Sequence, residues 1–414
     1  MTAAGRALDG DTSPLRVLLI TPVRGRDGRG GDVAYTEMLV AHPPPGVTYV
    51  TYDEALADGT LRHRGRRGEV LASWRSRGLR VAVIDLLLLV LGVVERSVRR
   101  QGWAFFEPTW FVSIEPDHYD LVHVHLFTVR QVGRRVPVVS SAGAPLPGLY
   151  AVRDGWGAGR LAWATWVERA WGRLTGATIP WLRAGDGDVP TVYTRHFAAQ
   201  FRGPGADRIR VVGTAVAPSE RPDGAREGPG SPTIGFIGRA FDRKGGPVAV
   251  QAHLAARRRW PAARLVVATT ARQIEGLPSA WREDPSIELV AAPSPSTVRE
   301  EILPGLDVLV LPTAWDCGAT MAVQEALECG VPVVTSTCEW LDERLVPPAV
   351  LRVAPDPEAI VAATAAVLAD PGAPAAARRL WAECFSPEVL HAELLGAYRA
   401  RLGGVGTDVA EVGR

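Results

Sequence analysis

An arginine and a lysine stand five residues apart in the second half of the chain, on a stretch bounded by glycines. Arg239 follows Gly238, and Lys244 precedes Gly245 and Gly246. A guanidinium binds phosphate as a planar fork and an ammonium binds it as a point charge, so the pair can grip a diphosphate from two sides. Lys244 is the only lysine among 414 residues. Because the chain otherwise uses arginine, this lysine favours a binding role over surface charge.

A carboxylate farther along the chain is the second candidate. Glu325 is the only acidic residue between Asp316 and Glu328. Its two oxygens can accept hydrogen bonds from both hydroxyls of a ribose. The alternative is an ordinary buried strand–helix–strand unit that carries one solvated glutamate, and this motif alone leaves both interpretations open.

Both candidates need strands and helices that bring them to one edge of a sheet. The apolar runs predict buried strands over 233–238, 308–311 and 331–334, and helices over 247–259 and 321–328. Pro312 closes one strand, and Gly330 after Cys329 ends a helix as a glycine C-cap. Open α/β sheets bind ligands at the carboxyl ends of their strands, where the start of a helix also offers N–H groups to an anion.

The first half of the chain offers a glycine pair and a strand with two histidines. Gly30 and Gly31 follow the predicted strand 14–21 and allow close approach of the backbone to a phosphate or a sugar. Residues 120–126 predict a strand in which His123 and His125 share a face. At the carboxyl end of that strand, His125 can bond to a sugar or acceptor hydroxyl. No third ligand is near, so no metal site is predicted.

Residues 318–334 resemble the C-terminal signature of GT-B nucleotide-sugar glycosyltransferases, in particular the large retaining family 4. The matching positions are Glu325, Ala326, Gly330, Pro332 and Val333. The Arg239 and Lys244 loop and the Phe-Ser-Pro-Glu opening of the last helix, residues 385–388, match in the same order.

The chain departs from the family pattern at two places. Cys317 stands where the family has its first acidic residue, with Asp316 one place early, and Ala142 stands where relatives often have a histidine near the transferred sugar. These departures motivate an alternative function, a catalytically weak nucleotide-sugar-binding protein that acts as an assembly partner.

The resemblance implies an α/β chain of the GT-B class, with two Rossmann-like doubly wound domains facing each other across a cleft. The expected acceptor-binding domain comprises residues 14–216 and 386–402, and the expected nucleotide-sugar-binding domain residues 232–385. Residues 217–231 are the expected linker, because they are rich in proline, glycine and charge, and 1–13 and 403–414 are the expected tails.

The resemblance also implies the reaction, a transfer of sugar from a nucleotide-diphosphate sugar to an acceptor hydroxyl with retention of anomeric configuration. Arg239 and Lys244 take the role of countercharge to the leaving diphosphate, with no metal and no other cofactor, and His125 is the third catalytic candidate. The expected donor-binding residues are Gly30, Gly31, Arg239, Lys244, Asp316, Cys317, Gly318, Ala319, Thr320, Met321 and Glu325. A lipid-linked, polysaccharide or natural-product acceptor fits equally well, and no nucleic acid is expected.

Composition bounds the class of protein. Hydrophobic residues make up 47% of the chain and charged residues 22%, which is typical of a globular protein with ordinary cores. The four cysteines form no C-x-x-C pair, and residues 1–13 have no apolar signal region, so a cytoplasmic protein is expected.

The charge distribution suggests a further partner. Residues 14–213 carry 26 arginines against 18 acidic residues, which favours an anionic partner, a membrane surface or simply a solvated arginine-rich surface. The apolar run 81–94 is shorter than the roughly 20 residues that span a bilayer. It predicts a buried helix, with a peripheral contact at the inner face of the cell membrane as the alternative. The tryptophans of 161–171 are expected to pack inward from a long helix.

Overall fold

The computed structural model describes residues 14–21, 31–63, 83, 86–87, 90–94, 97–98, 111–125, 128–131, 135–143, 146–175, 177–178, 189–200, 206–219 and 231–402. Its contacts divide the chain into two units, Met1–Val212 with His391–Arg414, and Gly213–Leu390. The sequence places these boundaries after residues 216 and 385. The contacts place them after 212 and 390, since Ala215 and Val216 are buried and Val216 N–H donates to the Phe385 carbonyl of the second unit. Both tails and residues 220–230 of the expected linker lie outside the described residues.

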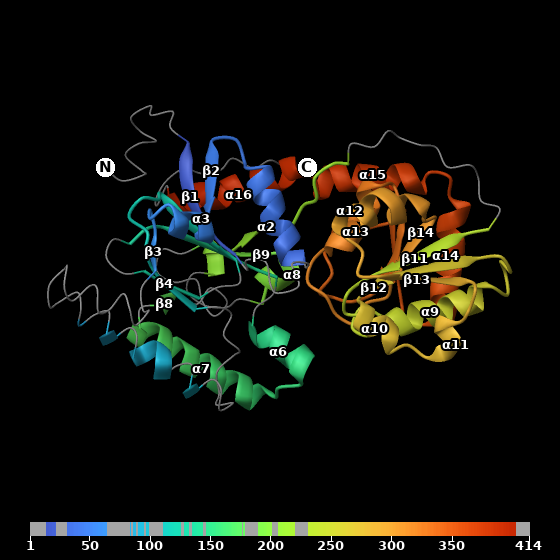
Figure 1. The fold of residues 1–414 in the computed structure, drawn as a ribbon, viewed down its shortest axis with the longest axis horizontal. Helices are drawn as coiled ribbons and strands as arrows, with labels where there is room; N and C mark the ends of the chain where they lie inside the picture. Colours follow the sequence, from blue (N-terminus) through green and yellow to red (C-terminus); the bar gives the residue numbers. More distant parts are fainter. Residues whose placement is uncertain are drawn as a thin grey trace. The chain divides into compact units, whose positions relative to one another are not determined.

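The first unit contains a parallel sheet of strand order β10-β9-β7-β5-β1-β2. Figure 1 labels β1, β2 and β9 of this sheet. Its strands are β1 (Leu15–Ile20), β2 (Val47–Thr51), β5 (Leu121–His125), β7 (Val138–Ala142), β9 (Val189–Val192) and β10 (Arg210–Val211). The associated helices are α2 (Gly31–Ala41), α3 (Tyr52–Ala57), α8 (Arg195–Ala198) and α16 (Pro387–Leu402), of which the part from His391 belongs to this unit. β5 and β7 are buried along their whole length, as expected for parallel strands covered on both faces.

A second, mixed sheet in the same unit has the order β3-β4-β6-β8. It consists of β3 (Arg62–His63), β4 (Phe111–Glu115), β6 (Thr128–Gln131) and β8 (Ala177–Thr178), and the helices α6 (Leu146–Asp154) and α7 (Ala158–Thr175) belong to the same region of the chain. The apolar pattern predicts none of these short strands.

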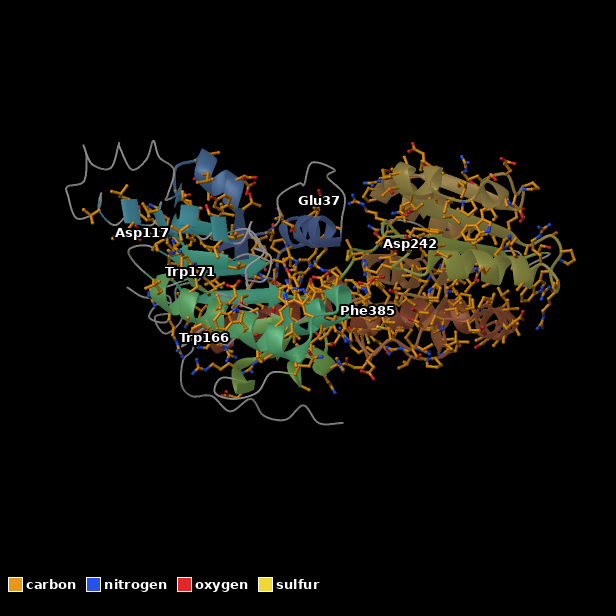
Figure 2. All side chains as sticks on the ribbon, turned by 90° about the horizontal axis from the view of Figure 1, so that it is seen from below. Glu37, Asp117, Trp166, Trp171, Asp242 and Phe385 are labelled. Atoms are coloured by element: carbon orange, nitrogen blue, oxygen red, sulfur yellow. The ribbon has the colours of Figure 1, made fainter. Side chains whose placement is uncertain are left out.

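Two tryptophans of α7 point outward, so the prediction that they pack inward is wrong. Trp163 and Trp166 are 55% and 60% exposed, and their rings stack with centroids 5.1 Å apart. Figure 2 shows Trp166 on this helix together with Trp171, which is partly buried. The helical spacing defined an apolar face correctly, but part of that face has no covering element.

The apolar run 81–94 gives a second correction. The residues of this run that the structure describes are helical, yet six of their apolar side chains are 43% to 58% exposed. They are Val83, Leu86, Leu87, Val90, Val93 and Val94. The prediction of a buried helix is therefore wrong for these side chains, which form an apolar stripe at helical spacing.

The second unit is a doubly wound sheet of order β13-β12-β11-β14-β15-β16, all parallel. Its strands are β11 (Thr233–Ile237), β12 (Arg264–Thr269), β13 (Ile287–Ala291), β14 (Val308–Leu311), β15 (Val333–Ser336) and β16 (Val350–Val353). Its longer helices are α9 (Gly246–Ala256), α13 (Met321–Glu328), α14 (Pro357–Ala369) and α15 (Ala373–Cys384). Shorter helical segments are α10 (Ala271–Glu275), α11 (Ser279–Arg282), α12 (Pro295–Thr297) and a π-helical turn Val298–Ile302.

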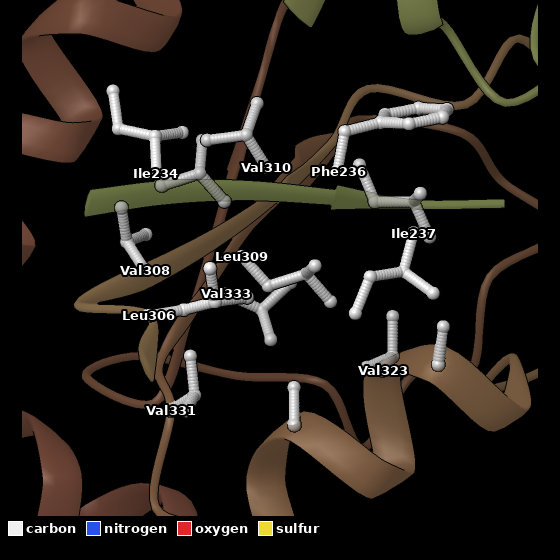
Figure 3. Packing of buried hydrophobic residues seen from close by; sticks show 14 of the residues in the cluster. Ile234, Phe236, Ile237, Leu306, Val308, Leu309, Val310, Val323, Val331 and Val333 are labelled. Carbon is white, nitrogen blue, oxygen red and sulfur yellow. The ribbon is translucent and has the colours of Figure 1, made fainter. Parts of the chain in front are cut away.

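The core of the second unit lies between the sheet and these helices. α9 packs with α14, and α13 packs with α15 (Figure 1). Figure 3 shows Ile234 and Phe236 of β11 among Val308 and Val310 of β14, with Val323 of α13 below the strand. Strands with apolar residues on both faces place their chemistry in the loops at their ends.

Two further observations bear on the sequence expectations. The acidic and basic residues of 338–345 predict a short helix, but this segment forms turns, so that prediction is wrong. Within the described ranges, no single helix is long and apolar enough to cross a membrane. The pair Pro357–Ala369 and Ala373–Leu402 passes by length and composition but is bent by 96°.

Candidate functional site

The two candidate loops of the second unit meet at the point where the strand order reverses. β11 and β14 are neighbours in the sheet, with Ile234 paired to Val308 and Gly235 to Leu309. The chain leaves β11 toward β12 and leaves β14 toward β15, on the opposite side. In an open α/β sheet such a switch point forms a crevice at the carboxyl ends of the strands. The β11–α9 loop and the β14–α13 loop both begin at this edge.

Three glycines give the β11–α9 loop its course. Gly245 has φ of 78°, and a Cβ there would collide with the carbonyl of Pro312 at the end of β14. A Cβ at Gly238 would lie 2.7 Å from Cδ of Lys244, and a Cβ at Gly246 would run into the Phe241 ring. The loop therefore packs directly on β14 and leaves room for the lysine stem beside Gly238.

The cations of this loop meet an acidic residue of the next loop. Lys244 Nζ lies 3.3 Å from Asp316 Oδ2, and Arg243 Nη1 lies 3.2 Å from Asp316 Oδ1. Arg243 also donates to the Trp315 carbonyl at 3.0 Å and stacks on the Trp315 ring at 4.6 Å. The sequence argument did not include Arg243. Its signal was its position beside Lys244, at the turn that leads into α9. Arg239 is exposed just after β11.

The β14–α13 loop is held by backbone contacts on both sides. Ala314 N–H donates to the Arg243 carbonyl at 2.9 Å, and Gly318 N–H donates to the Trp340 carbonyl at 2.9 Å. Gly318 adopts φ of 71°, which only glycine takes without strain. Because Gly318 N–H is already bonded, the predicted anion contacts from the stretch 318–321 fall to Ala319, Thr320 and Met321. Thr320 is the N-cap residue of α13, and its side chain makes no cap hydrogen bond.

Cys317 and Asp316 are coupled within this loop. Cys317 N–H donates to Asp316 Oδ1 at 3.0 Å. The carboxylate of Asp316 is thereby turned toward the cations of the neighbouring loop. This orientation follows from the loop backbone, which no periodic pattern in the sequence encodes.

Glu325 lies on the second turn of α13 and is partly exposed. Burial raises the pKa of its carboxyl to about 7. The negative charge of Glu328 also raises this pKa, whereas the positive charges of Arg299 and Lys244 lower it. The charge of Lys244 therefore acts on Glu325, which puts the two candidates from different loops within electrostatic range of each other. Hydroxyl donors that satisfy the carboxylate favour its ionised form.

Other residues of α13 bind the segment 213–219. Gln324 Nε2 donates to the Thr214 hydroxyl at 2.5 Å and to the Ala319 carbonyl at 2.6 Å. Glu328 accepts hydrogen bonds from both N–H and hydroxyl of Ser219, at 2.6 and 2.7 Å. Neither residue was predicted from the sequence, because a polar side chain that will be buried against a partner looks the same there as a solvated one. These bonds fix the position of the helix that carries Glu325.

In the first unit the predicted histidines are fully buried. His125 Nδ1 lies 2.8 Å from the Ser141 hydroxyl, and its ring packs against Tyr35 with centroids 5.0 Å apart. His123 contacts the same hydroxyl through Nε2 at 3.1 Å and the Tyr398 hydroxyl through Nδ1 at 2.8 Å. Burial, with a smaller contribution from His125, lowers the pKa of His123 to about 3. Contact of His125 with a substrate stays a prediction.

The remaining predicted residues of the first unit are placed as follows. Gly31 begins α2, whereas Gly30 lies outside the described residues. Ala142 is the last residue of β7 and is buried. Over the residues that the structure describes, no cluster of three or more His, Cys, Asp or Glu side chains could hold a metal ion.

Residues 231–370 match the family model described as glycosyl transferases group 1. No curated protein sequence matches the chain.

Solved glycosyltransferase structures cover both units. HepE of Anabaena, in complex with UDP and glucose, superimposes with a TM-score of 0.55 at 9% identity, over 93% of this chain and 100% of that chain. A glycosyltransferase from Rickettsia africae gives 0.54 at 11% identity, over 95% and 100%. AviGT4, involved in avilamycin A biosynthesis, gives 0.53 at 16% identity, over 95% and 99%. At these identities the similarity establishes the fold alone. The chain thus has the GT-B fold, and its residues 231–370 are similar to the glycosyl transferases group 1 family.

Proposed function

We propose that the protein transfers a sugar from a nucleotide-diphosphate sugar to an acceptor hydroxyl, with retention of anomeric configuration. The observation that carries this proposal is the meeting of two loops at the β11/β14 switch point. Lys244 of the first loop lies 3.3 Å from Asp316 of the second loop, which leads into the helix that carries Glu325. A diphosphate next to the lysine and a ribose at the carboxylate are the two parts of one nucleotide. The HepE structure, which contains UDP and glucose, makes UDP-sugars the first donors to test.

Each part of the site has a role in this reaction. Arg239 and Lys244 stabilise the negative charge that develops on the diphosphate as the bond from the sugar carbon to its oxygen breaks. The start of α13 offers N–H groups to oxygens of the donor. Glu325 accepts from the ribose hydroxyls. The acceptor oxygen bonds to the sugar carbon and gives its proton to the departing phosphate oxygen, so the step needs no protein nucleophile.

The cations replace a metal ion in this proposal. We expect transfer to persist in the presence of EDTA, with the product anomer identified by the proton coupling at its new glycosidic carbon. Loss of activity in EDTA that returns with Mg²⁺ would contradict metal independence, and an inverted anomer would contradict retention.

The alternative is a catalytically weak nucleotide-sugar binder that acts as an assembly partner, and Cys317 and Ala142 favour it. A thermal-shift screen of UDP-, GDP- and dTDP-sugars identifies the donor, because a ligand of the folded state raises its melting temperature. Donor hydrolysis or transfer by the purified chain then supports the enzyme. Binding without turnover across donors and acceptors supports the binder.

We also propose that the first unit makes a peripheral contact with an anionic membrane. The exposed stripe from Val83 to Val94 supports this, since apolar side chains at helical spacing suit a helix lying in a membrane interface. Its neighbours in the sequence include Arg77, Arg80, Arg96, Arg99 and Arg100. Such arginines attract anionic headgroups. A lipid-linked acceptor would be reached from this position.

A further inference from the structure

The carboxylate of Asp316 occupies the cationic side of the candidate donor site. Each of its oxygens faces a different cation, Lys244 Nζ at 3.3 Å and Arg243 Nη1 at 3.2 Å. The side chains of Lys244 and Asp316 are only 15% and 14% exposed, so water screens their attraction less than it does on the surface.

The two cations are held to different degrees. Arg243 has further partners in the Trp315 carbonyl and the Trp315 ring, which fix its guanidinium independently of Asp316. The pairing of Lys244 is looser. Asp316 Oδ2, the atom that faces the ammonium, has no hydrogen-bond partner among the described residues. A contact that is electrostatic without a formed hydrogen bond is given up more easily than a bidentate one.

A diphosphate that binds Lys244 must come close to the same carboxylate. The diphosphate and the Asp316 carboxylate are both negative and repel each other at close range, and one ammonium cannot neutralise both fully. The lysine stem lies against Gly238, where its Cδ occupies the space that a Cβ would need.

We propose that Asp316 competes with the donor diphosphate for Lys244. It pairs with the ammonium in the empty site, yields it when a nucleotide binds, and takes it back as the nucleoside diphosphate departs, so it weakens product binding and favours release. Asp316 is a positioning residue, since it acts through Lys244. This inference rests on the proposed function, because it requires that a diphosphate binds here.

The test is calorimetric titration of the full chain with UDP, GDP and dTDP, followed by titration of variants with the nucleotide that binds. Asp316→Asn removes the charge at constant size, and we expect it to bind the nucleoside diphosphate about five- to tenfold more tightly than wild type. The gain should shrink as salt is added. Affinity for the matching uncharged nucleoside should stay the same, which a general change in the site would not produce.

Two variants complete the experiment. Asp242→Asn removes the same charge from an exposed position of the loop that carries Lys244 (Figure 2) and should change the affinity by less than about twofold, because solvent screens it. Asp316→Glu retains the carboxylate and should bind the nucleoside diphosphate as weakly as wild type. Equal or weaker nucleotide binding by Asp316→Asn, with a wild type that binds, overturns the competition alone. A wild type that binds none of the three nucleotides overturns the proposed function as well.

Discussion

His123 on β5 and Tyr398 on α16 are joined by a contact of 2.8 Å between the imidazole Nδ1 and the phenol oxygen, across 275 residues of sequence. The Tyr398 hydroxyl also lies 2.7 Å from that of Tyr49 on β2. These polar contacts therefore hold α16 against the first sheet. Such groups specify one arrangement, because a helix displaced by one turn would leave them unpaired.

The first prediction concerns the acid stability of this unit. Because the pKa of His123 is lowered to about 3 in the fold, the unfolded chain binds one more proton between that value and the ordinary histidine pKa of about 6.5. The contribution of His123 to the free energy of unfolding is complete above the ordinary pKa. It falls by about 1.4 kcal/mol for each pH unit below it.

Urea denaturation of the full chain between about pH 7 and pH 5 measures this slope. His123→Asn should show a shallower decline than wild type. The control is His118→Asn, which makes the same change at an exposed position shortly before β5. Equal slopes for wild type and His123→Asn would refute the assignment.

The second prediction tests the space beside Gly238. Gly238→Ala places a methyl 2.7 Å from Cδ of Lys244 and should displace the lysine from the diphosphate position. We expect the donor KM to rise about tenfold, with a small change in melting temperature, because a flexible stem can move aside. Gly305→Ala is the matched control, since its Cβ meets nothing within 4 Å. An unchanged KM in Gly238→Ala would show that Lys244 does not need the space beside Gly238 to bind the diphosphate.

The third prediction follows from the raised pKa of Glu325, which is about 7. If the carboxylate binds the ribose, donor affinity should increase as the pH rises through that value, and by at most about tenfold per pH unit below it. A nucleotide sugar is the right probe because its diphosphate diester does not titrate in this range. In Glu325→Gln the affinity should be lower and independent of pH. A wild-type affinity that is flat between about pH 6 and pH 8 would count against ribose binding by the ionised form.

The fourth prediction tests the exposed apolar stripe. Vesicles that contain anionic phosphatidylglycerol should bind the wild-type chain, and Leu86→Glu with Val90→Glu should reduce this binding at least about tenfold, because two carboxylates would enter the lipid interface. Both positions are half exposed, so folding should be unaffected. Leu254→Glu, at an exposed position of α9 in the second unit, should bind vesicles like wild type. Undiminished vesicle binding by the double variant would rule out the apolar stripe as the membrane contact.

The second unit was predictable because its signals are local and strong. The apolar run closed by Pro312 gave β14, and Gly330 gave the end of α13, so both elements have the predicted bounds. The first unit was harder. β3 and β8 are two residues long and are defined only by pairing with distant strands, which leaves no pattern in their own sequence.

Burial and side-chain direction were the other limits. Helical spacing identified apolar faces around Trp166 and Leu86, but spacing does not show whether another element covers a face. In the candidate site, the types of Arg239, Lys244 and Glu325 indicated their chemistry. The direction of Asp316 depended on the turn at Gly318 and on the Cys317 N–H bond, which belong to the folded loop.

The central claim is that one nucleotide-binding site is formed at the β11/β14 switch point by a lysine from one loop and a glutamate from the next. Titration of the nucleoside diphosphate into wild type, Lys244→Ala and Glu325→Ala measures it most directly. We expect each variant to lose at least about tenfold in affinity while keeping the wild-type melting temperature within a few degrees, since a charge-assisted hydrogen bond contributes about 1.5–3 kcal/mol. Wild-type affinity in either variant would contradict the claim.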